Sequence, residues 1–475
     1  MGSPLLLTDG YKFSMAEAGW PLRPETFYYS HRKGGLQVLP FDVETELGRV
    51  VPELHAGDWE YLSTHEYDLG SAVKAALTSK QLTVKALPKF AVFSDREPVF
   101  TVSGASSLVS WLEPVLLMWS YRIQVATVAV LRPDELAAAV KTVTCEAQKQ
   151  LVLSTLDAVG VKAPPITVDS EGYVARVRAR VTELAEIVGS PARLFEVGLR
   201  AASCPEQHLL ALEGAKQAGL TRTSNVYGAQ QLGLVPVGTM GHEHIQRYGT
   251  DEAAFRAMVE RRYQRSSFLL DTFDTITSGI PTAYRIIAER KGQSDSIRYD
   301  SGDKEAQYRF AAAEAKRLGI RPVQILEDGF DAAQTQRFEV LRKEVGWKPE
   351  EQVYGYGGYI VAQTSGSPLT RDRVSAVYKL TQTGHRATMK FGNESGSGKQ
   401  SVPGRPVLFR RSAGASGPFG IVGQEGEAVP AGYALLTGAP ALAAPRVEQV
   451  AEVDRRIGLS PATQQLVDEL SKWKA

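Results

Sequence analysis

The stretch SIRYDSGDKEAQYRFAAAEAKRLG, residues 296–319, decides the fold class because it contains a complete strand–helix unit. Its first five residues alternate along a strand, so the side chains of Arg298 and Asp300 face the same way. A small, polar turn follows, and the apolar spacing over 303–318 predicts an amphipathic helix. One such unit is typical of a parallel βα layer.

The same strand-then-helix alternation recurs between residues 194 and 380. Helical patterns occupy 205–218, 243–264, 303–318 and 330–345. About eight such strands fit a closed barrel better than an open sheet, so the predicted fold is α/β with an irregular (β/α) barrel. The apolar runs that we interpret as strands are LFEVG (194–198), TRTSN (221–225), VPVGTM (235–240), SFLLDT (267–272), SIRYDS (296–301), VQILEDG (323–329), VYGYGG (353–358) and AVYKL (376–380).

The rest of the chain has a different texture. Residues 1–125 mix short β-prone pieces with helical ones and predict an N-terminal α+β domain. Residues 126–392 are predicted to form the catalytic barrel domain. Residues 393–475 begin with a Gly/Ser-rich loop, continue with β-like pieces and end in a helical pattern. This last part is too small for a core of its own, so we expect it to pack on the N-terminal domain.

The composition limits the possible partners and compartments. The formal net charge of +1 provides no global field that would attract nucleic acid or a membrane surface. Two cysteines, Cys145 and Cys204, exclude a disulfide scaffold and a cysteine zinc site, and fit a reducing compartment. The sequence has no signal-peptide pattern and no uninterrupted apolar run near 18 residues. We therefore expect a cytoplasmic protein.

Acidic and basic residues stand where the predicted strands end. Arg298 and Asp300 suit a sugar phosphate, with the guanidinium on phosphate oxygens and the carboxylate on ribose hydroxyls or Mg²⁺. The alternative is a surface ion pair before an Asp-capped helix. In SFLLDTFDT the spacing of Asp271 and Asp274 predicts that both carboxylates lie on one side of a helical turn, where they suit a metal or a ribose. The alternative for Asp271 is a helix N-cap.

Two further stretches contain candidates for phosphate binding. In YGYGGYI, Gly357 and Gly358 allow backbone N–H groups to approach a phosphate closely, although without further context a β-bulge or tight turn explains them better. The second stretch, residues 378–400, contains four cations in a glycine-rich setting that could close over pyrophosphate. A solvated surface is the alternative there. The four cations are Lys379, Arg386, Lys390 and Lys399.

The stretch GTMGHEHIQRYG, residues 238–249, contains His242 and His244. A zinc site is disfavoured because two histidines provide only two ligands and no HExxH motif or nearby cysteine completes the set. A general base or a nucleophile at the carboxyl end of a strand is better placed physically. The residues alone do not decide between these two roles.

Taken together, these stretches resemble the nicotinate phosphoribosyltransferases and the related nicotinamide phosphoribosyltransferases. The resemblance covers residue 5 to about residue 404, and its blocks are specific because they occur in register. The blocks are LLTDGYKFSM, FYYSHRKGG, FEVGLRAA, TSNV, GTMGHEH, LLDTFDT, IRYDSGD, YGYGG, VYKLT and MKFG.

The resemblance implies a type II phosphoribosyltransferase that acts as a head-to-tail homodimer with shared active sites. The implied reaction joins nicotinate to 5-phosphoribosyl-1-pyrophosphate (PRPP), releases pyrophosphate, requires Mg²⁺ and is coupled to ATP hydrolysis. The resemblance further implies that ATP phosphorylates His242 during turnover. His244 does not match the family position and is interpreted as a supporting or helix-surface residue. The ligands of the metal stay unassigned at this level.

The resemblance also assigns roles to residues of the other blocks. Tyr11 is similar to the aromatic residue that stacks on the pyridine ring from the neighbouring subunit, and Arg32 and Lys33 to basic residues that reach PRPP across that interface. Arg200 is similar to the arginine beside the base. The residues expected around ribose, phosphates and pyrophosphate are Asp271, Arg298, Asp300, Gly357, Gly358, Lys379, Lys390 and Lys399.

Three positions bear on the choice of base. Val197 stands where the family usually has an aromatic residue, and Ala201 stands where nicotinate enzymes commonly have a second arginine. Ser224 replaces the aspartate of the relatives that prefer the amide, and a serine does not repel nicotinate as a carboxylate would. Nicotinate is therefore the favoured base. Nicotinamide transfer and a non-catalytic sensor of pyridine nucleotides are the alternatives.

Overall fold

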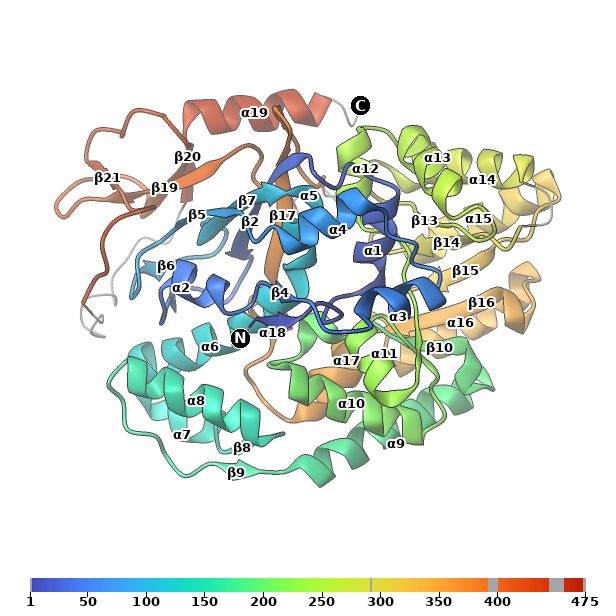
Figure 1. The fold of residues 1–475 in the computed structure, drawn as a ribbon, viewed down its shortest axis with the longest axis horizontal. Helices are drawn as coiled ribbons and strands as arrows, with labels where there is room; N and C mark the ends of the chain where they lie inside the picture. Colours follow the sequence, from blue (N-terminus) through green and yellow to red (C-terminus); the bar gives the residue numbers. More distant parts are fainter. Residues whose placement is uncertain (1, 291–292, 392–399, 444–456, 473–475) are drawn as a thin grey trace.

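The structure, a computed structural model, describes residues 2–290, 293–391, 400–443 and 457–472. Its largest sheet has seven parallel strands in the order β12-β11-β10-β16-β15-β14-β13. Residues of all seven strands line one cavity, so the sheet curls into a half-barrel (Figure 1). The predicted α/β class with an irregular barrel is confirmed, and β12 and β13 form the edges of the curl. The strands are β10 (Leu194–Glu196), β11 (Arg222–Thr223), β12 (Val235–Pro236), β13 (Ser267–Leu269), β14 (Ser296–Tyr299), β15 (Val323–Leu326) and β16 (Gln352–Tyr356).

Helices connect these strands, and α13 to α16 lie on the outer side of the half-barrel in Figure 1. The side chain of Asp303 accepts a hydrogen bond from Ala306 N at 3.0 Å and caps α15, and Gly319 ends that helix with a left-handed φ of 67°. The helices are α9 (Ser170–Val188), α10 (Pro205–Gln217), α11 (Val226–Leu232), α12 (His242–Tyr248), α13 (Asp251–Arg261), α14 (Ile280–Glu289), α15 (Lys304–Leu318) and α16 (Ala332–Val345).

The prediction of one helix over 243–264 is wrong. Gly249 adopts a left-handed φ of 83°, which ends α12 one turn after its histidines. The side chain of Thr250 then accepts a hydrogen bond from Ala253 N at 3.2 Å and begins α13. Because of this break, α12 is a short helix, and its buried residues His242–Arg247 lie beside the half-barrel.

The run AVYKL is not a barrel strand, contrary to the prediction. It belongs to β17 (Ala376–Thr383), which pairs antiparallel with β2 (Pro24–His31) in a five-stranded sheet of order β18-β17-β2-β7-β5. Parallel strands are usually joined by a crossover helix, whereas only short helices lie between β16 and β17. The other elements named here are β5 (Leu82–Ala86), β7 (Phe100–Ala105), β18 (Arg386–Ala387), α17 (Gly358–Val361) and α18 (Arg371–Val374). Thus β17 and β18, within 126–392, share a sheet with strands from 1–125.

The longest apolar helix, α6 (Glu113–Leu131), lies in the interior of the molecule. By length and composition it is the one described helix that could cross a membrane, but 89% of its most apolar window is buried inside the protein. This burial is that of a core helix. Its second half packs against α7 (Pro133–Ala139) and α8 (Glu146–Ala158), where a satellite core includes Val152 and Leu156.

The remaining N-terminal elements pack around the antiparallel sheet and beside the half-barrel. Helix α1 begins directly after a backbone bridge between Asp9 and Asn225, and this bridge ties the start of the chain to the end of β11. These elements are β1 (Ser3–Pro4), α1 (Gly10–Glu17), β3 (Gln37–Val38), α2 (Val43–Gly48), β4 (Pro52–Glu53), α3 (Asp58–Thr64), α4 (Ser71–Thr78), β6 (Val92–Phe93) and α5 (Ser106–Trp111).

A four-stranded sheet of order β21-β19-β20-β22 and helix α19 (Pro461–Ser471) form the described C-terminal part (Figure 1). Its strands are β19 (Pro406–Arg411), β20 (Gly420–Gln424), β21 (Tyr433–Leu435) and β22 (Ile457–Leu459). Arg410 Nη1 lies 2.8 Å from Glu97 Oε1, and Gly438 N donates to Ala86 O at 2.8 Å. These contacts attach the C-terminal sheet to the region of β5 to β7.

Candidate active site

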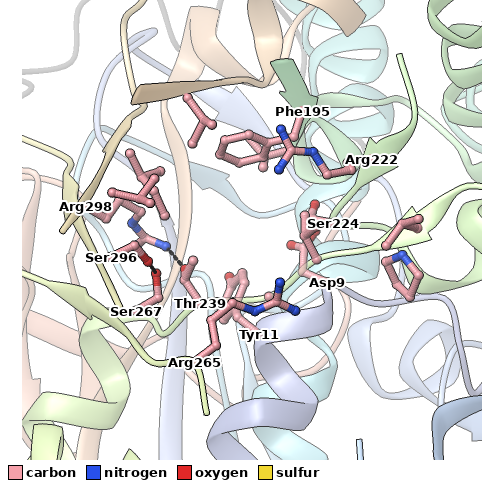
Figure 2. Close-up of a pocket in the computed structure, with 18 of the residues that line it drawn as sticks. Asp9, Tyr11, Phe195, Arg222, Ser224, Thr239, Arg265, Ser267, Ser296 and Arg298 are labelled. Carbon is pink, nitrogen blue, oxygen red and sulfur yellow. Dashed lines mark hydrogen bonds between the residues drawn. The ribbon is translucent and has the colours of Figure 1, made fainter. Parts of the chain in front are cut away.

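A cavity of about 380 Å³ lies inside the half-barrel. Alternate residues of its strands face the cavity, such as Ser296 and Arg298 of β14 and Val323 and Ile325 of β15. Figure 2 shows the polar groups that surround this space. At the carboxyl ends of the strands the lining includes Asp9, Tyr11, Val197, Arg200, Ser224, Gly238, Thr239 and Glu327.

An aromatic ring, an arginine and a buried carboxylate meet at this end of the cavity. The Arg200 guanidinium lies 5.7 Å from the centre of the Tyr11 ring and its Nε lies 3.5 Å from Asp9 Oδ2. Ser224 Oγ donates to Asp9 Oδ1 at 2.6 Å. Burial raises the pKa of Asp9, although Arg200 and Ser224 oppose the shift. Asp9 Oδ2 and Arg200 Nε have no hydrogen-bond partner among the described residues, and the two buried atoms face each other as an ion pair at the cavity end.

Glu113, the first residue of α6, holds this end of the cavity together. Tyr11 Oη donates to Glu113 Oε2 at 2.9 Å, and Lys12 Nζ lies 2.6 Å from the same oxygen. Lys379 Nζ is 3.5 Å and Arg200 Nη1 3.7 Å from Glu113 Oε1. Burial opposes the charged form of Glu113, but the cations around it hold its pKa well below the ordinary value. The carboxylate is therefore charged and fixes the positions of all four partners.

Lys379, in the middle of β17, is a cation whose charge is only partly balanced, because it shares Glu113 with other cations. Burial lowers its pKa to about 8, against the attraction of Glu113 and with help from Lys390, Arg200 and Arg32. Four cations thus lie close enough to affect one another electrostatically. Such a cluster suits a ligand with several negative oxygens, such as a diphosphate.

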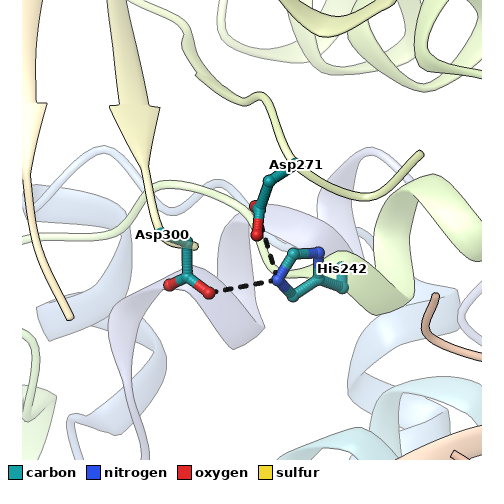
Figure 3. A group of neighbouring side chains, drawn as sticks. All are labelled: His242, Asp271 and Asp300. Atoms are coloured by element: carbon teal, nitrogen blue, oxygen red, sulfur yellow. Dashed lines mark hydrogen bonds and ion pairs between the residues drawn. The ribbon is translucent and has the colours of Figure 1, made fainter. Parts of the chain in front are cut away.

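His242 is the centre of a second cluster beside the first, shown with its two carboxylates in Figure 3. Its Nε2 lies 3.3 Å from Asp300 Oδ2, 3.6 Å from Asp271 Oδ1 and 2.7 Å from Lys390 Nζ. On the other side of the ring, Nδ1 lies 3.0 Å from Thr272 Oγ1. These residues come from the start of α12, from the ends of β13 and β14, and from the segment after β18.

The electrostatics favour a neutral imidazole. Burial and Lys390 lower the pKa of His242, while Asp271 and Asp300 oppose the shift. Since the Lys390 ammonium can only donate, Nε2 accepts from it and Nδ1–H donates to Thr272. In this arrangement the Nε2 lone pair is engaged by Lys390, and it becomes available for nucleophilic attack when that hydrogen bond is released. Burial opposes the charge on Asp300, but His242, Lys390 and Arg298 hold its pKa well below the ordinary value.

The two carboxylates fit a magnesium ion. The ligand atoms of His242, Asp271 and Asp300 lie within 4.8 Å of one another. Asp271 Oδ1 is buried without a hydrogen-bond partner among the described residues, whereas Oδ2 accepts from Ser301 Oγ. Carboxylate oxygens are the ligands that Mg²⁺ prefers. The donor set therefore suits Mg²⁺ on Asp271 and Asp300 better than zinc.

The remaining phosphate candidates have different environments. Arg298 is buried in the cavity wall, where its Nη1 donates to Thr239 Oγ1, so it is not a surface ion pair. Gly357 and Gly358 form the turn from β16 into α17, and a Cβ at residue 358 would lie 2.4 Å from Asp372 Oδ2. Because the Asp372 side chain is exposed and can move, this contact does not by itself require glycine at residue 358.

Of the described basic candidates, Lys33 and Arg386 lie outside the two clusters. Lys33 is exposed in the turn after β2. Arg386 Nη2 donates to Arg247 O at 2.9 Å and anchors the end of α12. Lys399 lies outside the described residues. Arg32, by contrast, contributes to the field at Lys379.

One local prediction is wrong, and one of the two interpretations of His244 is excluded. Asp271 and Asp274 do not share a helical turn, because the chain leaves β13 in an extended loop and Asp274 caps the π-helical turn Thr275–Gly279 through Ile276 N and Thr277 N. Asp271 is the one at the site. His244 is not a helix-surface residue, since it is fully buried and its Nε2 lies 2.9 Å from Ala254 O.

Tyr11 lies in the cavity of its own chain, although the resemblance assigns it to a neighbouring subunit's site. The sequence interpretation also missed Asp9, Glu113 and Thr272. Glu113 had a usable signal: it is the one acid within the apolar run WLEPVLLMW, and a buried charge needs partners. Asp9 stands two residues before Tyr11, and Thr272 directly follows Asp271. Neither residue had any other signal in the sequence.

Comparisons with known proteins find relatives in sequence and in fold. No family model matches the chain. The nicotinate phosphoribosyltransferase pncB2 of Mycobacterium tuberculosis is 26% identical over 263 residues, which cover 55% of this chain and 52% of that protein. The pncB1 protein of the same organism is 30% identical over 249 residues, with 50% of each chain covered. The chain thus matches about half the length of these curated relatives.

Solved structures match more of the chain. The nicotinate phosphoribosyltransferase of Porphyromonas gingivalis superposes with a TM-score of 0.61 at 18% identity, covering 84% of this chain and 96% of that one. That of Vibrio cholerae gives a TM-score of 0.59 at 17% identity, with 82% and 89% covered. These structures establish a shared fold. Together with the sequence relatives, they confirm the resemblance that the sequence blocks predict.

Proposed function

We propose that this chain, a relative of the nicotinate phosphoribosyltransferases with their fold, transfers the 5-phosphoribosyl group of PRPP to nicotinate. The products would be nicotinate mononucleotide and pyrophosphate, in a step of NAD biosynthesis that is coupled to ATP hydrolysis through phosphorylated His242. One observation carries the proposal: the aromatic–arginine end of the cavity lies beside the His242 cluster, close enough for Arg200 and Asp300 to affect each other electrostatically. A base and a phosphorylated ribose can therefore meet there.

The base would lie against the Tyr11 ring, with its carboxylate on Arg200. Arg200 keeps its guanidinium beside that ring, and its Nε has no hydrogen-bond partner among the described residues. Val197 lines the same cavity and offers an aliphatic second face. Ala201 adds no second cation, so Arg200 alone would neutralise the substrate carboxylate.

Nicotinamide is the second candidate base, and Asp9 is the observation that favours it. Its Oδ2 is buried at the cavity end and can accept from an amide N–H₂. Comparing kcat/KM for the two bases decides between them. In addition, Asp9→Asn should reduce kcat/KM for nicotinamide more than for nicotinate if Asp9 accepts from the amide.

The ribosyl transfer step needs positioning and charge stabilisation. The C1–pyrophosphate bond breaks, an oxocarbenium-like ribose develops, and the pyridine nitrogen forms the new bond. Asp300 would hold the ribose hydroxyls, while Lys379, Lys390, Arg298 and the backbone at Gly358 would receive phosphate oxygens. Mg²⁺ on Asp271 and Asp300 would neutralise pyrophosphate when bound.

The coupling step uses the lone pair on His242 Nε2. It attacks the γ-phosphorus of ATP, a P–N bond forms, the bond to the bridging oxygen breaks, and ADP leaves. Thr272 would hold the Nδ1 proton in place. Lys390, at 2.7 Å from Nε2, is positioned to stabilise the negative charge of the phosphoryl group.

The resemblance also supports a homodimer and a cytoplasmic setting as parts of this proposal. Tyr11 and the other residues of the base pocket described above come from one chain. A second subunit would therefore add residues to this pocket and is not needed to supply the aromatic ring. Pyrophosphate release from PRPP in the presence of each base, with and without ATP, is the direct test. Absence of release with either base would leave the alternative of a non-catalytic pyridine-nucleotide sensor.

A further inference from the structure

The two cysteines of the chain lie against each other. Cys145 and Cys204 are 59 residues apart in sequence, yet their Sγ atoms are 3.6 Å apart. A buried residue touches about 6 to 12 others, so a contact between two given residues of this chain has a chance probability of a few per cent. The pairing therefore calls for an explanation beyond apolar filling.

Both cysteines also occupy the same place on a helix. Cys145 is the N-cap of α8 and its Sγ accepts from Gln148 N at 3.4 Å, while Cys204 is the N-cap of α10. The positive end of a helix favours a thiolate. Serine, threonine, asparagine and aspartate are the usual N-caps, so cysteine at both positions is an unusual choice.

We propose that Cys145 and Cys204 form a redox modification site that peroxide closes into a disulfide. Disulfide formation requires the sulfurs to approach by roughly 1.5 Å, which side-chain rotation at two helix starts can provide. A small oxidant is needed because the residues are only 6% and 3% exposed. Peroxide meets this requirement, whereas a glutathione-sized disulfide does not.

The order of the chemical steps follows from the two environments. The contact with Cys204 lowers the pKa of Cys145, with help from Gln148 N and against burial, whereas the same contact and burial raise the pKa of Cys204. The Cys145 thiolate therefore attacks hydrogen peroxide first, forming a sulfenic acid and releasing hydroxide. The sulfur of Cys204 then attacks that of Cys145, the S–O bond breaks, and the S–S bond forms. In total, two thiols and one peroxide give one disulfide and two waters.

The disulfide would affect the proposed base pocket, and this consequence rests on the proposed function. Cys204 follows the turn Leu199–Ala201, which holds Arg200 at the cavity. Linking Cys204 to α8 removes freedom from that turn. We expect a higher Tm and an altered KM for the base in the oxidised protein.

Intact mass and differential alkylation of the full chain test the proposal. Hydrogen peroxide should lower the mass by about 2 Da, remove both alkylatable thiols and produce a 145–204 cross-linked peptide, all reversed by a dithiol. Cys145→Ser and Cys204→Ser, each with one thiol, serve as matched controls and should show no intrachain loss. Two thiols that stay alkylatable, or oxidation that stops at sulfinic acid, would overturn the proposal. These readouts need no turnover and so are independent of the proposed reaction. An equal KM for the base in both redox forms would overturn the link to Arg200.

Discussion

Lys390 Nζ lies 2.7 Å from His242 Nε2, so the proposed phosphoryl acceptor has an ammonium group at its reactive nitrogen. The lysine follows β18 in the antiparallel sheet, whereas the histidine begins α12 beside the half-barrel. The ammonium favours the neutral imidazole, and in the proposed reaction it would release Nε2 and face the phosphoryl group. Both effects favour phosphorylation.

Replacing His242 by alanine should abolish the stimulation of transfer by ATP. The alanine side chain cannot form a P–N bond, while the base and PRPP sites retain their other residues. Pyrophosphate release measured with and without ATP should give the same rate in this variant, at the basal level. His244→Gln is the matched control and should keep the ATP response. Equal proportional loss with and without ATP in His242→Ala would contradict the phosphohistidine role.

Replacing Lys390 by methionine should raise the pKa of His242, because one of the two causes that lower it is removed. Since the reactive form is the neutral imidazole, the acid limb of the ATP-coupled rate should move to higher pH by roughly one unit. The pH–rate profile measures this shift. Lys390→Arg keeps the charge and should leave the limb near its original pH. An unmoved limb in the methionine variant would show that another group controls it.

The affinity for PRPP should fall as the pH rises through about 8. Burial lowers the pKa of Lys379 to about 8, so its ammonium is charged below that pH and neutral above it. KM for PRPP, measured from about pH 7 to about pH 9.5, should rise across this window. In Lys379→Arg the guanidinium stays charged and the rise should disappear. A rise of the same size in that variant would contradict the assignment.

Glu113→Gln should destabilise the fold by about 3–5 kcal/mol near neutral pH, because it leaves buried cations without their shared carboxylate. The pKa of Glu113 is well below its ordinary value in the folded protein. Its contribution is therefore fully present above the unfolded pKa and is lost as the pH falls through the lower folded pKa. Denaturant unfolding should show the gap between variant and parent narrowing at acidic pH. Glu305→Gln, at a part-exposed residue of α15 that pairs with Arg309 and Arg337, should change little. A gap in Glu113→Gln that does not depend on pH would contradict this explanation.

The α/β class and the strand ends could be predicted because their signals are local. Apolar runs with polar ends mark parallel strands, and the carboxyl ends of such strands meet at one edge. For this reason His242, Asp271 and Asp300, far apart in sequence, come together in the structure. The sequence could not predict the distances between these three side chains, but it correctly predicted that all three lie at the carboxyl ends of the strands.

The remaining features depend on tertiary contacts that leave no local trace. The run containing Lys379 has the same appearance as the barrel strands, and only its partner β2 reveals that it is antiparallel. Asp9 enters the cavity because a backbone bridge joins it to Asn225 on a distant strand. The proximity of Cys145 and Cys204 is likewise set by the packing of α8 and α10 rather than by their spacing.

The departure of β17 from the half-barrel brings the site's charged residues from two different sheets. Asp271 and Asp300 come from the half-barrel, whereas Lys379 and Lys390 come from the antiparallel sheet or the segment after it. Attraction between these opposite charges, such as the Lys390–Asp300 ion pair, therefore helps to hold the two sheets together at the site. An anion that binds between the two sheets competes with the carboxylates for the lysines and so changes this attraction. The departure of the anion restores it. If the proposed diphosphate substrate binds there, its arrival and the release of pyrophosphate would change how strongly the two sheets attract each other.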